Sequence, residues 1–472
     1  MNGTESPSSS ASTFTLGDAG GGLGDEIEVS TEEVRKSIAL EDEATRILQG
    51  GRPFEYILQT FSLDHEGDLT TARCMALVFA SSSVANGDGL HCYLSGSSGK
   101  GKTHAAETMF RQLPDEYRYN RSFSDRYLFY AGNDPKSGLK EGVVVLVDDQ
   151  TMSESVQEIF KVAVSHFKEG TDYGTVVNQK PHTLKMPPRI SWCLLKVDDP
   201  GDDQVMNRLI QARIQETEDK IRDSAKKIQE KYRNLKKKNI EKDRPEVRIC
   251  REIWSRIKIE RVAVEVPCAG HVVFADYENL RNHELFFNLM MAHAVIHRWQ
   301  RREIGTTEDG ILIIEADETD YKEARYIFEA LHSFGGQHHN TLKSEDAVID
   351  ALIRMDLEGG IFTVSQIAVE TGMSHNNCYR ALNGRTSGKV MAKMGGLLEK
   401  CPFIQNAGKR GQYELETETQ IIQGKYQNSE ITRKESRNED IYTVDVKALR
   451  AWKNQIEPVK LTPGFKWEKV KS

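Results

Sequence analysis

The most specific chemical signal in the sequence is a run of eight residues that fits the pattern G-x-x-x-x-G-K-[ST] in full: Gly96, Ser97, Ser98, Gly99, Lys100, Gly101, Lys102 and Thr103. Glycines let backbone N–H groups curl around a β-phosphate, and a helix beginning here presents its positive end to the anion. Lys102 would neutralise charge on the β- and γ-phosphates, and the Thr103 hydroxyl would bind Mg²⁺. The run therefore predicts an ATP-binding loop.

A phosphate loop of this kind needs an acid at the end of a second strand. Val143–Val147 is a run of five apolar residues, typical of a strand buried on both faces of a parallel sheet. It is followed by Asp148, which we expect to hold the Mg²⁺ through water. Asp149 is then placed to orient or polarise the attacking water as a general base. Together the two runs predict an α/β P-loop ATPase with ATP and Mg²⁺ as cofactors.

The elements that must position these residues follow from apolar spacing and turn signals. Two helices are expected over residues 31–61, broken at 50–53, and a third over 68–84. A strand at 91–94 precedes the loop and a helix at 104–113 follows it. After the acidic pair we expect a helix, a hairpin with its tip at 178–181, a buried strand and the start of another helix, at 153–168, 173–186, 190–195 and 202–208.

Composition sets the broad class. The chain has 472 residues, a net charge of −8 and 38% hydrophobic residues, which indicates a globular protein of about three domains. Its longest apolar runs fall far short of the ~20 residues of a membrane span. Residues 1–30 contain no Lys or Arg and predict a disordered tail without a targeting signal. Seven scattered cysteines favour neither a disulfide framework nor a zinc site, so a cytoplasmic location is expected.

Charge is unevenly distributed along the chain. Residues 220–261 hold 16 basic and 7 acidic side chains, a net +9 in a chain that is acidic overall. The first half of this segment has helix-forming composition without Gly or Pro. Two interpretations stay open: a solvated helix with internal ion pairs, or a face that tracks nucleic-acid phosphates.

The order of these motifs resembles that of ring-forming AAA+ ATPases. The hairpin before the third strand is similar to the one in superfamily III and MCM-type helicases, and residues 88–213 look like ATPases of archaeal plasmids and viruses. In the helicases the hairpin tip carries a basic residue that contacts DNA in the central channel, which the resemblance places at Lys180. It also implies that Arg208 is an arginine finger reaching a neighbour's nucleotide, in a ring that is possibly a hexamer. The alternatives are a solvated turn lysine and an ordinary surface arginine.

Two family features depart from the pattern or are weakly marked. Those helicases keep a polar sensor residue, usually Asn, after the hairpin strand, whereas Lys196 and Asp198 are the polar residues available here. The resemblance also implies a helical lid after the core, expected at 263–340, where Arg325 is a weak sensor-2 candidate and an ordinary helix residue is the alternative.

Residues 362–382 fit a helix-turn-helix. Gly372 permits the left-handed residue of the turn and Ser374 caps the second helix. Cys378 and Leu382 face inward, which leaves five polar or aromatic residues for a nucleic-acid groove: His375, Asn376, Asn377, Tyr379 and Arg380.

Two short β-prone runs beyond it, 403–405 and 412–415, flank a glycine-rich basic stretch that contains Lys409 and Arg410. This pattern predicts a hairpin with a basic tip, like the wing of a winged helix. DNA binding is favoured, and a winged helix used for protein contact is the alternative.

These observations predict an α/β P-loop ATPase with an AAA+-like parallel sheet, a helical lid and a C-terminal winged helix. The expected function is an ATP-dependent DNA motor, a helicase or translocase in DNA replication, acting as a homo-oligomer without membrane contact. The alternatives are an ATP-switched DNA-binding regulator or initiator and a remodeller of a protein partner; no nuclease or primase carboxylates are evident. The expected divisions are tail, N-terminal helices, ATPase core, basic helix, lid-like domain, winged helix and C-terminal tail, at 1–30, 31–87, 88–215, 216–262, 263–340, 341–416 and 417–472.

Overall fold

The structure is a computed structural model. It describes most of the chain from Thr31 onward, in these ranges: 31–97, 99–120, 127–148, 154–177, 180–196, 208–233, 243–274, 280–333, 343–355, 357–386, 393–411, 419–422, 425–428, 438–453 and 458–467.

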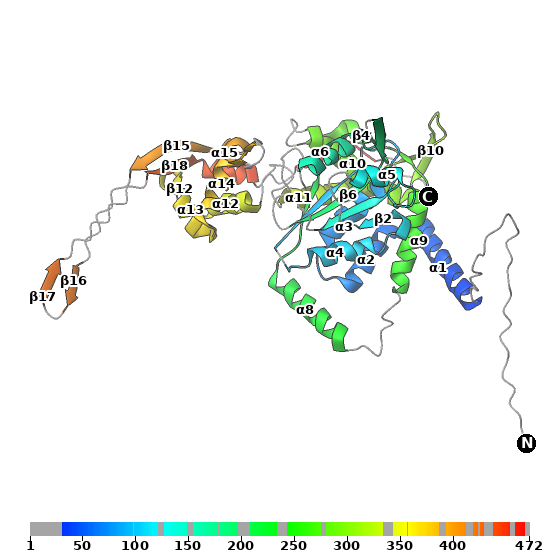
Figure 1. Ribbon diagram of the computed structural model, residues 1–472, viewed down its shortest axis with the longest axis horizontal. Coiled ribbons are helices and arrows are strands. Elements are labelled where there is room, and N and C mark those ends of the chain that lie inside the picture. The colour runs from blue at the N-terminus through cyan, green and yellow to red at the C-terminus, as the bar shows by residue number, and fades with distance from the viewer. Residues whose placement is uncertain are drawn as a thin grey trace, which may run out of the picture.

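Helices surround a central parallel sheet in the first part of the chain (Figure 1). The sheet strands, in chain order, are β1 (Cys92–Ser95), β2 (Arg118–Asn120), β3 (Val144–Asp148), β6 (Ser191–Lys196) and β7 (Ile210–Arg213). The helices are α1 (Thr31–Gly50), α2 (Pro53–Asp64), α3 (Leu69–Ser81), α4 (Lys102–Phe110), α5 (Tyr127–Asn133), α6 (Glu154–Ser165), α8 (Glu218–Arg233), α9 (Pro245–Ile259), α10 (Leu280–Ile296) and α11 (Glu318–Ser333).

The spatial order of the sheet is β2-β3-β6-β1-β7, with every neighbouring pair parallel. Alternate residues of β1, β3 and β6 enter two separate apolar clusters. Leu94 and Leu146 belong to the cluster formed with α3, α4 and α9, whereas Tyr93 and Val145 belong to the one formed with α5 and α6. Both faces of the sheet are therefore covered, as the continuous apolar run of β3 predicts.

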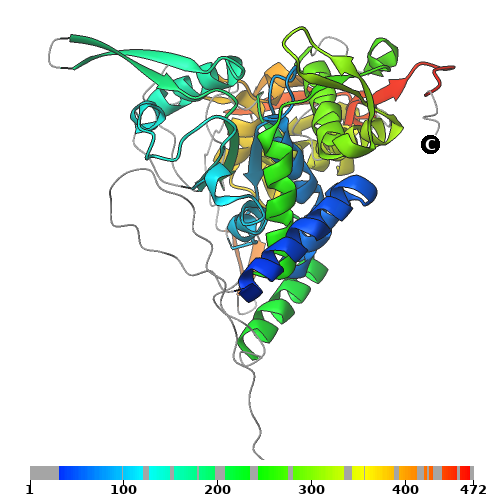
Figure 2. The ribbon, with the colours of Figure 1, turned by 90° about the vertical axis from the view of Figure 1, so that its right-hand side faces the viewer.

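The hairpin predicted before the third core strand consists of β4 (Thr171–Val177) and β5 (Lys180–Met186), paired antiparallel. Figure 2 shows it (teal) extending away from the rest of the molecule. Lys180 is the first residue of β5 and pairs with Val177; residues 178–179, part of the predicted tip, lie outside the described ranges. The sequence predicts a helix that begins at 202, but the structure has the strand β7 at 210–213. Residues 202–207 lie outside the described ranges.

The segment expected to form a separate lid shares the core of the sheet. Phe286 and Leu289 of α10 and Ile327 of α11 lie in the same buried cluster as Phe79 of α3 and Trp254 of α9. The small strands of this region are β8 (Ala263–Glu265), β9 (Val272–Phe274), β10 (Arg302–Thr306) and β11 (Leu312–Glu315). Because α10 is buried along most of its C-terminal half, it is an interior helix rather than an amphipathic one.

A second body is formed by the C-terminal elements, whose apolar cluster is separate from the first (Figure 1). Its sheet has the order β12-β18-β15, and five described helices pack with it. The elements are α12 (Lys343–Arg354), β12 (Ile361–Thr363), α13 (Val364–Thr371), α14 (His375–Asn383), α15 (Leu397–Lys400), β15 (Ile404–Gly411), β18 (Asn438–Val444) and α16 (Val446–Lys453), with the short pairs β13 (Arg385–Thr386) with β14 (Lys393–Met394) and β16 (Thr419–Ile422) with β17 (Lys425–Asn428).

Two expectations for this region need correction. Residues 404–411 form one continuous strand that pairs with β18, so Lys409 and Arg410 lie within β15 and not at the tip of a hairpin closed by 412–415. Tyr442, Val444 and Leu449 are buried in the second core, so part of the expected tail belongs to this body. The last described strand, β19 (Val459–Leu461), pairs with β9 of the first body.

Lys258 gives the first body a measurable pH dependence. It is buried in α9, where its Nζ donates to Ser82 Oγ and to the carbonyl of Gly142, each at 2.8 Å. Burial lowers the pKa of Lys258 from 10.5 to about 7. Between these values the unfolded chain binds one more proton, so the free energy of unfolding should rise by about 2 kcal/mol from pH 7 to pH 9.

We expect Lys258→Met to lose this rise in urea-unfolding curves measured at pH 7, 8 and 9. The exposed Lys460 supplies a matched control, since Lys460→Met removes a lysine that water already solvates. Parallel pH curves for the wild type and Lys258→Met would contradict the assignment.

Candidate nucleotide-binding site

The phosphate loop lies at the carboxyl edge of the parallel sheet. It begins directly after Ser95, the last residue of β1, and α4 starts at Lys102. Gly99 and Gly101 have φ values of 74° and 94°, a region that favours glycine. The sequence pattern therefore folds into a strand–loop–helix unit, with the N-terminus of α4 directed to the position that an anion would take.

The two functional side chains of the loop lie as the pattern predicts. Lys102 is buried, and its Nζ donates to the carbonyl of Gly96 at 2.9 Å, so the ammonium is held inside the loop. Thr103 Oγ1 donates to Asp148 Oδ1 at 3.3 Å, which joins α4 to the end of β3. A hydroxyl and a carboxylate oxygen are a donor set that suits Mg²⁺. Thr103 and Asp148 would hold this ion, whose chemistry is to neutralise phosphate charge.

The connection from β7 to α8 encloses the loop from the other side, a feature that sequence reasoning missed. Glu216 accepts from the Ser97 backbone N–H at 2.8 Å and from Ser97 Oγ at 3.0 Å. Lys220 Nζ donates to the carbonyl of Lys100 at 3.4 Å. These residues follow no motif, so only the parallel pairing of β7 with β1 brings them to the loop.

Other predicted site residues lie elsewhere or outside the described part of the chain. Three of them lie outside the described part of the chain: Ser98, Asp149 and Asp198. Lys196 ends β6, but its side chain also lies outside the described part. Arg208 precedes β7, in which Ile210 N donates to the carbonyl of His91 at 2.7 Å. Arg208 is thus at the amino edge of the sheet, opposite the phosphate loop. Sensor 1 stays unassigned.

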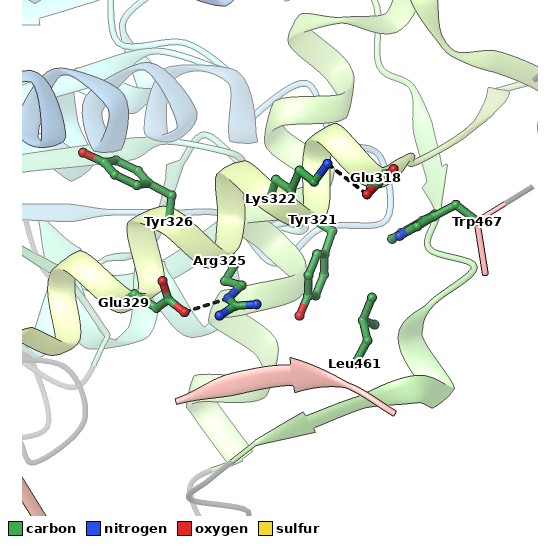
Figure 3. A pocket seen from close by; sticks show the side chains of 8 residues that line it. All are labelled: Glu318, Tyr321, Lys322, Arg325, Tyr326, Glu329, Leu461 and Trp467. Atoms are coloured by element: carbon green, nitrogen blue, oxygen red, sulfur yellow. Dashed lines mark hydrogen bonds and ion pairs between the residues drawn. The ribbon is translucent and has the colours of Figure 1, made fainter. Parts of the chain in front are cut away.

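Arg325 lies in a groove of about 420 Å³ between α11 and the C-terminal segment (Figure 3). Its Nε is 2.6 Å from Glu329 Oε1 within the same helix. Tyr321 of α11 faces Trp467 across this groove, with ring centroids 6.2 Å apart. Arg325 is therefore paired with a carboxylate of its own helix, in a groove whose other wall is the C-terminal segment.

The first part of the predicted basic segment forms α8, and three of its described lysines are engaged in ion pairs. Lys220 pairs with Asp68 at 2.5 Å and Lys227 with Glu66 at 2.8 Å, while Lys226 pairs with Asp223 on the helix itself. These contacts favour the ion-paired interpretation for this helix over the phosphate-tracking one.

In the second body, the turn between α13 and α14 has the predicted chemistry. Gly372 is left-handed with φ 68°, and Ser374 accepts from the N–H of Asn377 at the start of α14. Cys378 and Leu382 are buried. The face left exposed consists of the five predicted residues: His375, Asn376, Asn377, Tyr379 and Arg380.

The two bodies are joined by an ion pair at the carboxyl edge of the central sheet. Arg213, the last residue of β7, pairs with Asp346 in the first turn of α12 at 2.5 Å. Arg213 also aligns with Ser95, the residue before the phosphate loop. The second body is therefore attached beside the nucleotide site.

The fold and the loop define an α/β P-loop NTPase. Residues 37–260 match the model of a family described as the MTBMA_p00010 P-loop domain. The chain is also similar to the uncharacterized protein MTBMA_p00010 of Methanothermobacter marburgensis, with 24% identity over 347 residues. The match covers 70% of this chain and 43% of that protein, so the chain spans less than half of its relative's length.

Within the described ranges, every helix is too short or too polar to cross a bilayer. The same residues hold no cluster of three or more His, Cys, Asp or Glu side chains arranged for a metal ion.

Proposed function

We propose that this chain is an ATP-dependent DNA motor, a helicase or translocase that acts in DNA replication as a ring-shaped homo-oligomer. The observation that carries the proposal is the β4–β5 hairpin. It extends from the ATPase body immediately before β6 and has the exposed Lys180 at the start of its second strand (Figure 2). A basic residue on a projecting hairpin, coupled to a P-loop site, is suited to contact with a phosphate backbone.

The five-stranded parallel sheet, with the phosphate loop after β1 and Asp148 at the end of β3, supports the ATPase part of the proposal. The position of Arg208 supports the oligomer. At the amino edge of the sheet, it lies on the side opposite its own phosphate loop. An arginine finger at this place serves the nucleotide of a second copy, where its charge would stabilise the transition state.

Within the site, each residue then has a role in hydrolysis. Lys102 binds the β- and γ-phosphates, Thr103 and Asp148 hold the Mg²⁺, and Asp149 orients the attacking water. The peptide N–H groups of the loop, with α4 behind them, stabilise the phosphate charge.

The second body supports DNA binding as a winged helix. Its α14 follows a capped turn and exposes Asn376, Asn377 and Arg380. Asparagine and arginine are side chains that read base edges in a major groove. Lys409 and Arg410 on β15 would add phosphate contacts, now from a strand and not from a hairpin tip.

One observation favours the alternative, an ATP-switched DNA-binding regulator or initiator that does not unwind DNA. The Arg213–Asp346 pair attaches the second body next to the phosphate loop, a place where nucleotide can control DNA binding without any translocation.

The experiment that separates the two is the ATPase rate with and without single-stranded or duplex DNA. For the motor, DNA should raise the rate several-fold, and Lys180→Ala should keep the basal rate and lose the stimulation. Lys185→Ala is the matched control, because Lys185 is exposed on the same strand beside the base of the hairpin. A rate that ignores DNA, together with tight binding to one sequence, would select the regulator.

A further inference from the structure

A buried polar network centred on Asp68 lies against the phosphate loop. Asp68 comes from the connection between α2 and α3, and only 1% of its surface is exposed. Its Oδ1 accepts from the Gln215 backbone N–H at 2.7 Å. Its Oδ2 accepts from His65 Nε2 at 2.7 Å and pairs with Lys220 Nζ at 2.5 Å. Two segments distant in sequence, residues 65–68 and 215–220, therefore meet at one carboxylate.

The conformation of Asp68 indicates that these contacts determine its position. It is the N-cap residue of α3, where an aspartate normally accepts from the first N–H groups of its own helix. Here it makes no such capping bond, and its φ of 55° is left-handed. A non-glycine residue in this region costs about 1–2 kcal/mol. The bonds to Gln215, His65 and Lys220 hold it there.

The network reaches the phosphate loop at three points. Lys220 donates to the carbonyl of Lys100, and Gly101 lies against His65, since a Cβ on Gly101 would be 3.4 Å from His65 Cε1. His104 of α4 has its Nδ1 2.9 Å from His65 Nδ1. Because His65 Nε2 donates to a carboxylate, the tautomer with a lone pair at Nδ1 can accept there from the Nδ1–H of His104.

We propose that Asp68 is a positioning residue for nucleotide binding: through Lys220 and His65 it fixes the backbone of the phosphate loop from Lys100 to His104. Phosphate affinity depends on the directions of the N–H groups in this stretch, which must be set before the anion arrives. The proposal rests on nucleotide binding at this loop, which is part of the proposed function, and is independent of DNA.

The test measures binding of ADP and ATP with Mg²⁺ by calorimetry on the full chain, well below the unfolding temperature. In Asp68→Asn an amide N–H₂ replaces one carboxylate oxygen, so the side chain can no longer accept both from the Gln215 N–H and from His65 with Lys220, and the negative charge paired with Lys220 is lost. We expect at least a 10-fold loss of affinity for both nucleotides. Asp88→Asn removes an exposed, ion-paired carboxylate and is the control, expected to bind as the wild type does.

Two further variants separate positioning from a loss of fold. Lys220→Met keeps the aliphatic stem, and Asp68→Asn combined with Lys220→Met removes both buried charges together. We expect the double variant to recover part of the unfolding free energy lost in either single variant, because no buried charge is left unpaired. Its affinity should stay low, because the Lys100 carbonyl still lacks its donor.

Wild-type affinity in a folded Asp68→Asn protein would overturn the proposal. So would an affinity that recovers together with stability in the double variant. If the wild-type chain itself binds neither nucleotide, nucleotide binding at this loop, and with it the proposed function, is wrong. Measurements on the wild type alone show this, so that failure is distinguished from a failure of the positioning proposal.

Discussion

Replacing Lys102 with alanine should lower the ATPase rate by about 100-fold or more. Lys102 is buried, and its Nζ lies 2.9 Å from the Gly96 carbonyl, so its positive charge is held inside the loop. Removing it leaves the β- and γ-phosphate charge to the peptide N–H groups and the metal ion alone. Steady-state phosphate release at saturating ATP gives the rate, and calorimetry gives the affinity.

Lys136→Ala controls for the loss of a lysine as such, because Lys136 is exposed in the turn after α5. Circular dichroism and a thermal melt show whether Lys102→Ala is folded. A folded Lys102→Ala protein that keeps more than a tenth of the wild-type rate would show that hydrolysis occurs elsewhere in the preparation or the chain.

The elements nearest the motif could be predicted from sequence because local rules determine them. The phosphate loop, β3 with Asp148, and the capped turn at Gly372 and Ser374 each depend on a few adjacent residues. Their conformations follow from glycine geometry, apolar runs and capping side chains. The structure confirms these elements, while the roles of the site residues stay predictions.

What could not be predicted depends on pairing between distant segments. β7 is four residues long, and only its register with β1 brings Glu216 and Lys220 to the loop. The sequence pattern predicts a local hairpin for the strand after Phe403, but the partner of this strand is β18, which begins at Asn438. No local rule specifies a pairing across so long a connection. The sequence does not predict the Asp68 network for the same reason, since its members come from the α2–α3 connection, the β7–α8 connection and α8.

Acid should destabilise the chain through His91, the residue before β1. Its ring is buried against Phe160 and Phe167, its Nδ1 accepts from the Trp192 backbone N–H, and its Nε2 has no hydrogen-bond partner among the described residues. Burial lowers the pKa of His91 from 6.5 to about 3. The unfolded chain therefore binds one more proton between these values, and stability falls as the pH drops through this window.

Between pH 7 and pH 4 this single group should cost about 3 kcal/mol of the unfolding free energy. We expect His91→Gln, whose amide can still accept from Trp192 N–H, to lose about that much less than the wild type over the same range in urea-unfolding curves. His166→Gln is the control, because His166 is exposed.

His297 adds to the acid sensitivity and stays in both proteins, since its burial lowers its pKa to about 3 as well. The His91→Gln protein should therefore remain acid-labile, with a shallower slope. If its slope between pH 7 and pH 4 equals that of the wild type, the ring of His91 is protonated or hydrated in the folded state. The packing of Phe160 and Phe167 around it would then be looser than the structure shows.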